Sequence, residues 1–164
     1  MTLEEFNQLS DSAARAALTP CVNIAEWVEA MSQARPFASV DEAISAATTA
    51  SNDWQPEAVS RALASHPRIG ERMAGNSKEA DLSRAEQASL GLGEQQIADA
   101  LLQGNQQYEQ RFGRVFLIRA KGRTPADILE HLHRRLQNSD AQEWRETAEQ
   151  LQQITVLRFK ELVN

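Results

Sequence analysis

Residues 140–162 read DAQEWRETAEQLQQITVLRFKEL, a stretch rich in residues that favour helices. Trp144, Ala148, Leu151 and Ile154 recur at helical spacing and fall on one face of this stretch. The sequence therefore predicts a long final helix from about Asp140 to Leu162, which must bury its apolar face against other helices.

Arg158 lies on or near this apolar stripe, four positions after Ile154 and seven after Leu151. A charge on a buried stripe must be paired or must contact an anion. This makes Arg158 a candidate binding residue. The alternative is an arginine whose stem packs on the stripe while its head reaches water.

The first part of the chain predicts five shorter helices. Capping boxes open two of them, at Thr2-x-x-Glu5 and Ser39-x-x-Glu42. Prolines mark several helix ends, because the residue before proline is pushed out of the helical region. The predicted segments are a short helix after Thr2, about 10–18, about 24–31 before Pro36, a helix after Ser39, and a helix from Pro56 that ends at His66-Pro67.

The second part predicts one long helix, one short extended run and one further helix. The long helix begins near Glu94 and ends at Gly113. Residues 115–118 form an apolar run too short for a helix, and it reads as an extended core segment. Thr124-Pro125 is a strong helix start. We therefore expect residues 1–164 to form a single compact all-α domain of about eight helices, with a loop over about 70–82.

The charge and composition of the chain limit the kinds of molecule that it is expected to bind. Seventeen Lys and Arg against 23 Asp and Glu give a net charge of −6, which argues against nucleic acid and anionic membrane surfaces. No stretch is apolar enough to cross a membrane. The single cysteine, Cys21, cannot form an intramolecular disulfide and reads as a small buried residue. With no secretory signal and no peroxisomal tripeptide apparent, we expect a cytoplasmic protein that binds small molecules or copies of itself.

His66 stands just before a proline, so its ring is expected at the end of a helix, where an imidazole can serve as acid or base. The alternative is a histidine favoured by the helix dipole. Glu86 belongs to Ser83-Arg84-Ala85-Glu86, a capping-box pattern that explains its carboxylate without a ligand. In the functional interpretation, Glu86, Ser83 and Gln87 offer polar groups to a ligand from one helix turn.

Two further patterns predict no site. His131 and His133 lie about 200° apart around a helix and cannot bind one metal ion, so no metal site is predicted. The basic segment between Arg111 and Arg123 reads as a solvated face or an interface.

Six motifs stand in register over nearly the whole chain. They are Arg35-Pro-Phe, His66-Pro67, Ser83-x-x-Glu86-Gln87, Leu102-x-x-Asn105-x-x-Tyr108-x-x-Arg111-Phe112-Gly113, Phe116-Leu-Ile and Ile154-x-x-Leu157-Arg158. Together they resemble the 2-oxo-4-hydroxy-4-carboxy-5-ureidoimidazoline decarboxylase family. Arg68-Ile69-Gly70 departs from the Asp-Leu-Ala of many relatives.

The resemblance implies an all-α homodimer without a cofactor that decarboxylates a ureidoimidazoline to (S)-allantoin in urate degradation. It suggests His66 as the acid or base, with Glu86 and Arg158 as essential partners. The alternative is a non-catalytic helical module that binds an anion or a partner. The substrate contacts implied by the resemblance are Pro67, Ser83, Arg84, Ala85, Glu86, Gln87, Phe116, Leu117, Ile118, Arg119 and Ala120.

Overall fold

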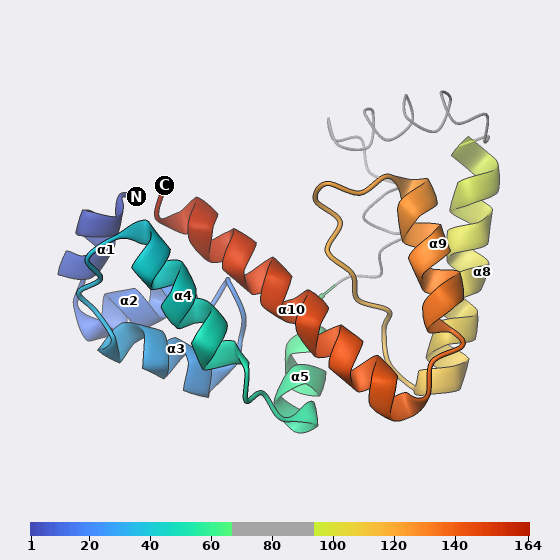
Figure 1. The fold of residues 1–164 in the computed structure, drawn as a ribbon, viewed down its shortest axis with the longest axis horizontal. Coiled ribbons are helices and arrows are strands. Elements are labelled where there is room, and N and C mark those ends of the chain that lie inside the picture. Colours follow the sequence, from blue (N-terminus) through green and yellow to red (C-terminus); the bar gives the residue numbers. More distant parts are fainter. Residues whose placement is uncertain (67–93) are drawn as a thin grey trace. The chain divides into compact units, whose positions relative to one another are not determined.

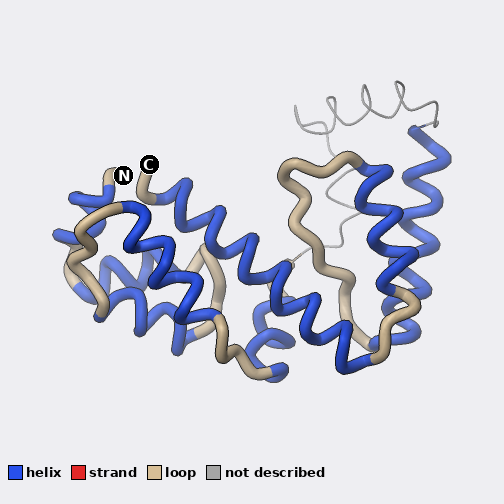
Figure 2. The backbone as a smooth tube through the Cα atoms, in the orientation of Figure 1, coloured by secondary structure: helices blue, strands red, loops and turns tan. Residues whose placement is uncertain are grey.

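The computed structural model describes residues 1–66 and 94–164 (Figure 1). These residues contain eight helices and no strand, which confirms the all-α prediction (Figure 2). The expected loop over 70–82 lies outside the described residues. The helices are α1 (Leu3–Gln8), α2 (Asp11–Leu18), α3 (Ala25–Gln33), α4 (Val40–Ser51), α5 (Pro56–Leu63), α8 (Glu94–Phe112), α9 (Pro125–Arg135) and α10 (Asp140–Leu162).

The chain divides into two compact units. Unit 1 contains Met1–Ala62 and Ala148–Asn164, and unit 2 contains Leu63–Thr147. The first part of α10 thus belongs to unit 2 and the rest to unit 1. The expectation that the whole chain behaves as one domain stays a prediction.

One of the two predicted capping boxes forms in full, at α1. At α1 the Thr2 side chain accepts a hydrogen bond from the Glu5 amide at 3.1 Å, and the Glu5 carboxylate accepts one from the Thr2 amide at 2.8 Å. At α4 the Ser39 side chain accepts a bond from the Glu42 amide at 3.1 Å, but the Glu42 carboxylate accepts one from the Ala38 amide and not from Ser39, so that box is only half formed. Thr124 and Asp127 make the same reciprocal pair at α9, with Pro125 in its first turn. Because these bonds satisfy amides that have no partner within the helix, the sequence alone could locate the starts.

The core of unit 1 is aromatic. The Phe159 ring of α10 lies edge-on to Phe6 and Trp27, with centroid distances of 5.6 and 6.5 Å. The Trp27 indole donates to the Ala47 carbonyl at 3.0 Å, which ties α3 to α4. The chain ends also lie together here, since the Met1 amine donates to the Leu162 carbonyl at 3.2 Å (Figure 1).

Arg35 of the Arg35-Pro-Phe motif has a structural task in unit 1. Its guanidinium donates to the carbonyls of Phe6 and Leu9 at 2.9 and 2.8 Å, and it lies 5.5 Å from the centroid of the Phe6 ring. These carbonyls stand at the C-terminal end of α1, where a helix leaves acceptors unsatisfied. Arg35 therefore binds the end of α1 to the region after α3.

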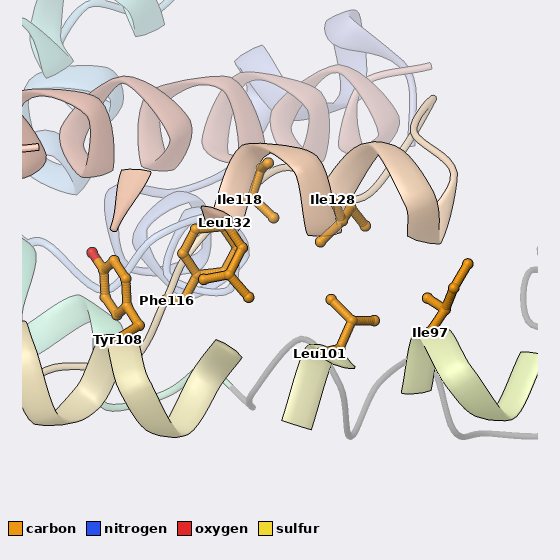
Figure 3. Packing of buried hydrophobic residues seen from close by; sticks show 7 residues of the cluster. All are labelled: Ile97, Leu101, Tyr108, Phe116, Ile118, Ile128 and Leu132. Carbon is orange, nitrogen blue, oxygen red and sulfur yellow. The ribbon is translucent and has the colours of Figure 1, made fainter. Parts of the chain in front are cut away.

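The core of unit 2 lies between α8, α9 and the segment that joins them. Figure 3 shows its side chains converging from these three parts of the chain. The predicted end of α8 is confirmed at Gly113, which has a φ of 71° and donates to the Glu109 carbonyl at 2.8 Å. The buried members of this core are Ile97, Leu101, Tyr108, Phe116, Ile118, Ile128 and Leu132.

Gly104 sets the distance between α8 and α9. A Cβ atom added at this buried glycine would overlap the side chain of Leu132, which is itself fully buried. The two helices can therefore approach closely only because residue 104 has no side chain.

We expect Gly104→Ala to lower the free energy of unfolding by about 1 kcal/mol. Overpacking costs about 1–3 kcal/mol, and alanine returns about 1 kcal/mol of helix propensity. Thermal unfolding followed by circular dichroism measures the change, and Gln103→Ala at the exposed neighbouring position is the control. A raised melting temperature for Gly104→Ala would contradict this account of the contact.

Candidate active site

His66 follows α5 by three residues, and its backbone amide donates to the Leu63 carbonyl at 3.0 Å. The helix therefore ends three residues before the predicted His66-Pro67, and a turn after it carries His66. The residue is only 8% exposed, so its imidazole lies in a protected environment within unit 2. Histidine is the side chain that serves most often as a general acid or base, so this place in the fold is open to that role.

Several predicted site residues lie outside the described residues. They are Pro67, Ser83, Arg84, Ala85, Glu86 and Gln87, together with the divergent Arg68-Ile69-Gly70. Whether Glu86 serves as a cap or points toward a ligand therefore stays a prediction.

Arg158 lies on the part of α10 that belongs to unit 1. It precedes the fully buried Phe159, and its own side chain is half-buried, so it stands at the edge of the buried stripe. Its guanidinium donates to the Pro20 carbonyl at 3.2 Å. A half-buried arginine at the edge of the stripe is compatible with both interpretations of Arg158.

Cys21 lies near Arg158 and is buried, as predicted. Burial raises the pKa of the Cys21 thiol to about 11, although the positive charge of Arg158 acts in the opposite direction. The thiol is protonated at neutral pH and is therefore a poor nucleophile. Cys21 contributes to packing in unit 1.

The 116–120 segment belongs to unit 2 and lies in the connection between α8 and α9, which Figure 2 draws as loop. Phe116, Leu117 and Ile118 are buried, as expected for a core segment, while Arg119 and Ala120 are half-buried. The segment forms no strand. The side chains of Phe116 and Ile118 lie in the core of unit 2. Because the segment is not part of a sheet, its backbone groups depend on other partners.

A buried polar network beside this segment was missed by the sequence analysis. Arg135 is 1% exposed and Glu143 is fully buried, and their side chains form an ion pair. Nε of Arg135 donates to Glu143 Oε1 at 2.8 Å, and the Tyr108 hydroxyl donates to the same oxygen at 2.6 Å. Burial, and then the hydrogen bond to Glu143, raise the pKa of Tyr108 to about 12, so Tyr108 stays a donor.

The signal for this pair was available in the sequence. Arg135 lies seven positions after Ile128 and three after Leu132, on the apolar stripe of α9. Glu143 lies eight positions before Leu151, on the buried line of α10. Both residues are therefore charges on an apolar stripe, as Arg158 is, and each must be paired or contact an ion.

The basic segment is engaged within the chain. Arg111 donates to the Asn138 carbonyl at 2.8 Å, and Arg114 bonds to Asp140 at 3.2 Å and stacks 3.8 Å from the centroid of the Trp144 ring. Arg123 donates to the Arg119 carbonyl at 2.9 Å. Arg119 donates to the Lys121 carbonyl, so contacts within unit 2 engage four of the five basic side chains between residues 111 and 123.

No helix among residues 1–66 and 94–164 is long and apolar enough to cross a membrane. Within the same ranges, no group of three histidine, cysteine, aspartate or glutamate side chains is placed to hold a metal ion.

Comparison with known proteins defines the class. The chain is 32% identical over 164 residues to 2-oxo-4-hydroxy-4-carboxy-5-ureidoimidazoline decarboxylase of Haloferax volcanii, covering 98% of this chain and 95% of that one. It is 27% identical to the uric acid degradation bifunctional protein PucL of Bacillus subtilis, covering 99% of this chain and 33% of the relative. These relatives indicate an enzyme of the decarboxylase class.

The solved structures and the family model agree. A crystal structure of OHCU decarboxylase in the presence of (S)-allantoin matches with a TM-score of 0.71 and 26% identity, covering 94% of this chain and 99% of that one. An (S)-allantoin synthase matches at 15% identity with a TM-score of 0.69 over 100% of this chain and 54% of its own, a likeness of fold alone. The OHCU decarboxylase family model matches residues 7–160. The chain belongs to the OHCU decarboxylase family and is a carboxy-lyase of urate degradation.

Proposed function

We propose that this chain converts 2-oxo-4-hydroxy-4-carboxy-5-ureidoimidazoline to (S)-allantoin and CO2. The observation that carries the proposal is the match to the OHCU decarboxylase family over residues 7–160, nearly the whole chain. Loss of CO2 leaves an electron pair on the ring carbon, and the imidazoline ring can delocalise it. The protein then has to orient the substrate, stabilise developing charge and deliver a proton to one face.

In this proposal His66 handles the proton shift at the substrate hydroxyl or ring carbon. Its protected place after α5 supports this role. Glu86 orients or polarises the substrate. Residues Pro67, 83–87 and 116–120 contact it.

Arg158 is proposed to bind a ring or ureido oxygen on which charge accumulates. An arginine that gripped the departing carboxylate would favour the ground state, because the product CO2 is neutral. The half-buried position of Arg158 at the edge of the buried stripe supports a binding role.

The substrate is a small molecule, and we propose that the enzyme acts as a homodimer in the cytoplasm without a cofactor. These three properties come from the family resemblance and the sequence composition.

A coupled assay tests the function. The unstable substrate is generated from urate by the two upstream enzymes, this protein is added, and circular dichroism follows the chiral product. We expect (S)-allantoin to form faster than the substrate decays by itself. A folded protein that gives the same signal as the protein-free control would contradict the proposal and favour the non-catalytic binding module.

Glu86→Gln separates the two interpretations of Glu86. If the carboxylate acts on the substrate, we expect turnover to fall by at least about tenfold while the melting temperature stays unchanged. If Glu86 only caps a helix, the amide keeps most of the capping bond and turnover changes little. The same assay and a thermal melt measure both, and the melting temperature of Ser83→Ala reports the cost of losing the cap itself.

A further inference from the structure

The carbonyl of Leu117 is held by a buried arginine. Residues 115–120 belong to no helix or strand, so their backbone groups have no ladder of hydrogen bonds. Leu117 is 4% exposed, and an unsatisfied carbonyl there would cost folding free energy. NH1 of Arg135 donates to this carbonyl at 2.7 Å.

The same guanidinium holds the segment at a second point. Its central carbon lies 4.4 Å from the centroid of the Phe116 ring, a cation–π distance in a site closed to water. Arg135 therefore contacts two consecutive residues of the 116–120 segment, one through its backbone and one through its side chain.

The orientation of Arg135 is itself enforced. Glu143 accepts hydrogen bonds from Nε and NH2 of Arg135, and the Thr147 hydroxyl lies 3.3 Å from NH2. The other oxygen of Glu143 accepts a bond from the Asn138 amide at 3.0 Å, and Tyr108 donates to the first. The planar guanidinium is thus held from two sides.

Stability alone does not explain this arrangement. Removing two charges from water is costly, and packed apolar residues of similar size are often as stable or more stable. The buried pair of Arg135 and Glu143 leaves NH1 of Arg135 to bond to the Leu117 carbonyl, and this bond fixes the position of the 116–120 segment.

We propose that Arg135, oriented by Glu143, is a positioning residue that fixes the 116–120 segment in the conformation that binds substrate. This inference rests on the proposed function, in which that segment contacts the ureidoimidazoline. It adds two residues that the family resemblance did not single out.

Arg135→Lys is the first test. Lysine keeps a positive charge beside Glu143, but a single ammonium cannot bond to Glu143, Thr147 and the Leu117 carbonyl in the geometry of the planar fork. The control is Arg134→Lys, because Arg134 is the exposed neighbour on the same helix and pairs with Glu146 at 2.9 Å. The double variant Arg135→Met/Glu143→Gln removes both buried charges and leaves neither one unpaired. It replaces Arg135→Lys in the test if the lysine variant does not fold.

The first readout is hydrogen exchange of the peptide that covers 113–124, followed by mass spectrometry. We expect the amides of the 116–120 segment to exchange at least about tenfold faster in Arg135→Lys than in the wild-type protein, since losing a hydrogen bond to a charged group frees the loop. Arg134→Lys should exchange as the wild type does. Unchanged exchange in Arg135→Lys and in the double variant would overturn the inference.

The second readout is steady-state kinetics. We expect KM to rise about tenfold with kcat within about threefold of the wild type, because the segment is proposed to bind ground state and transition state alike. A merely structural role would lower the active fraction, and therefore the apparent kcat, without raising KM. An active Arg135→Lys enzyme with an unchanged KM would overturn this inference and leave the proposed function intact. A wild-type protein that shows no turnover would overturn the proposed function, and the inference with it.

Discussion

Replacing His66 by asparagine is expected to lower kcat by about 10²–10⁴-fold, the usual contribution of a general acid or base. Asparagine retains a polar side chain but cannot take up or release a proton near neutral pH. Because proton transfer occurs in the transition state and not in substrate binding, KM should stay close to the wild-type value. Initial rates of (S)-allantoin formation in the coupled assay measure both constants.

The matched control for this variant is His133→Asn. His133 is exposed on α9 and has no role in the proposed mechanism. Its variant should retain full activity, and both variants should give helical circular dichroism spectra like that of the wild type. Turnover within about twofold of the wild type in His66→Asn would remove His66 from the mechanism.

Replacing Arg158 by lysine is expected to lower kcat about 10²–10³-fold, the usual cost of losing one donor to developing negative charge. Lysine keeps the charge but presents a compact ammonium in place of a planar fork of donors. Because Arg158 is only half-buried, at the edge of the stripe in unit 1, we expect the substitution to cost little stability, so the lower kcat reports on the reaction.

Arg15→Lys is the control for Arg158→Lys. Arg15 belongs to unit 1 and forms an exposed ion pair with Glu29 at 3.1 Å, which contributes little to stability. We expect wild-type activity from this variant and melting temperatures close to the wild type for both. An unchanged kcat in Arg158→Lys would contradict the binding role. It would favour the alternative, in which the apolar part of the Arg158 side chain packs on the stripe and its guanidinium contacts water.

The local features of the fold could be predicted because their causes lie within a few residues. Thr2 and Glu5 bond to each other's backbone at α1, and Gly113 ends α8 with a positive φ. The proline after His66 likewise predicted an end to the helix before it. Such signals act through short hydrogen bonds and backbone sterics, so they remain visible in a sequence without a structure.

The candidate site was predicted in a different way. His66, Glu86 and Arg158 each have an ordinary structural explanation when taken alone, as a helix-end histidine, a capping glutamate and a packed arginine. The resemblance of six motifs in register changed that interpretation, because a whole pattern is more specific than any of its members. Of the three residues, the described structure locates His66 and Arg158.

By itself the sequence determined the helical class, most helix ends, the apolar stripes and the family. Only the tertiary structure revealed the partners of residues far apart in the chain. Arg35 binds the end of α1, and Arg135 binds Glu143 and the Leu117 carbonyl. The position of a charged residue on an apolar stripe predicts that its side chain is buried. The groups that form hydrogen bonds with that side chain come from other parts of the chain through tertiary packing, so the spacing of residues within one helix cannot identify them.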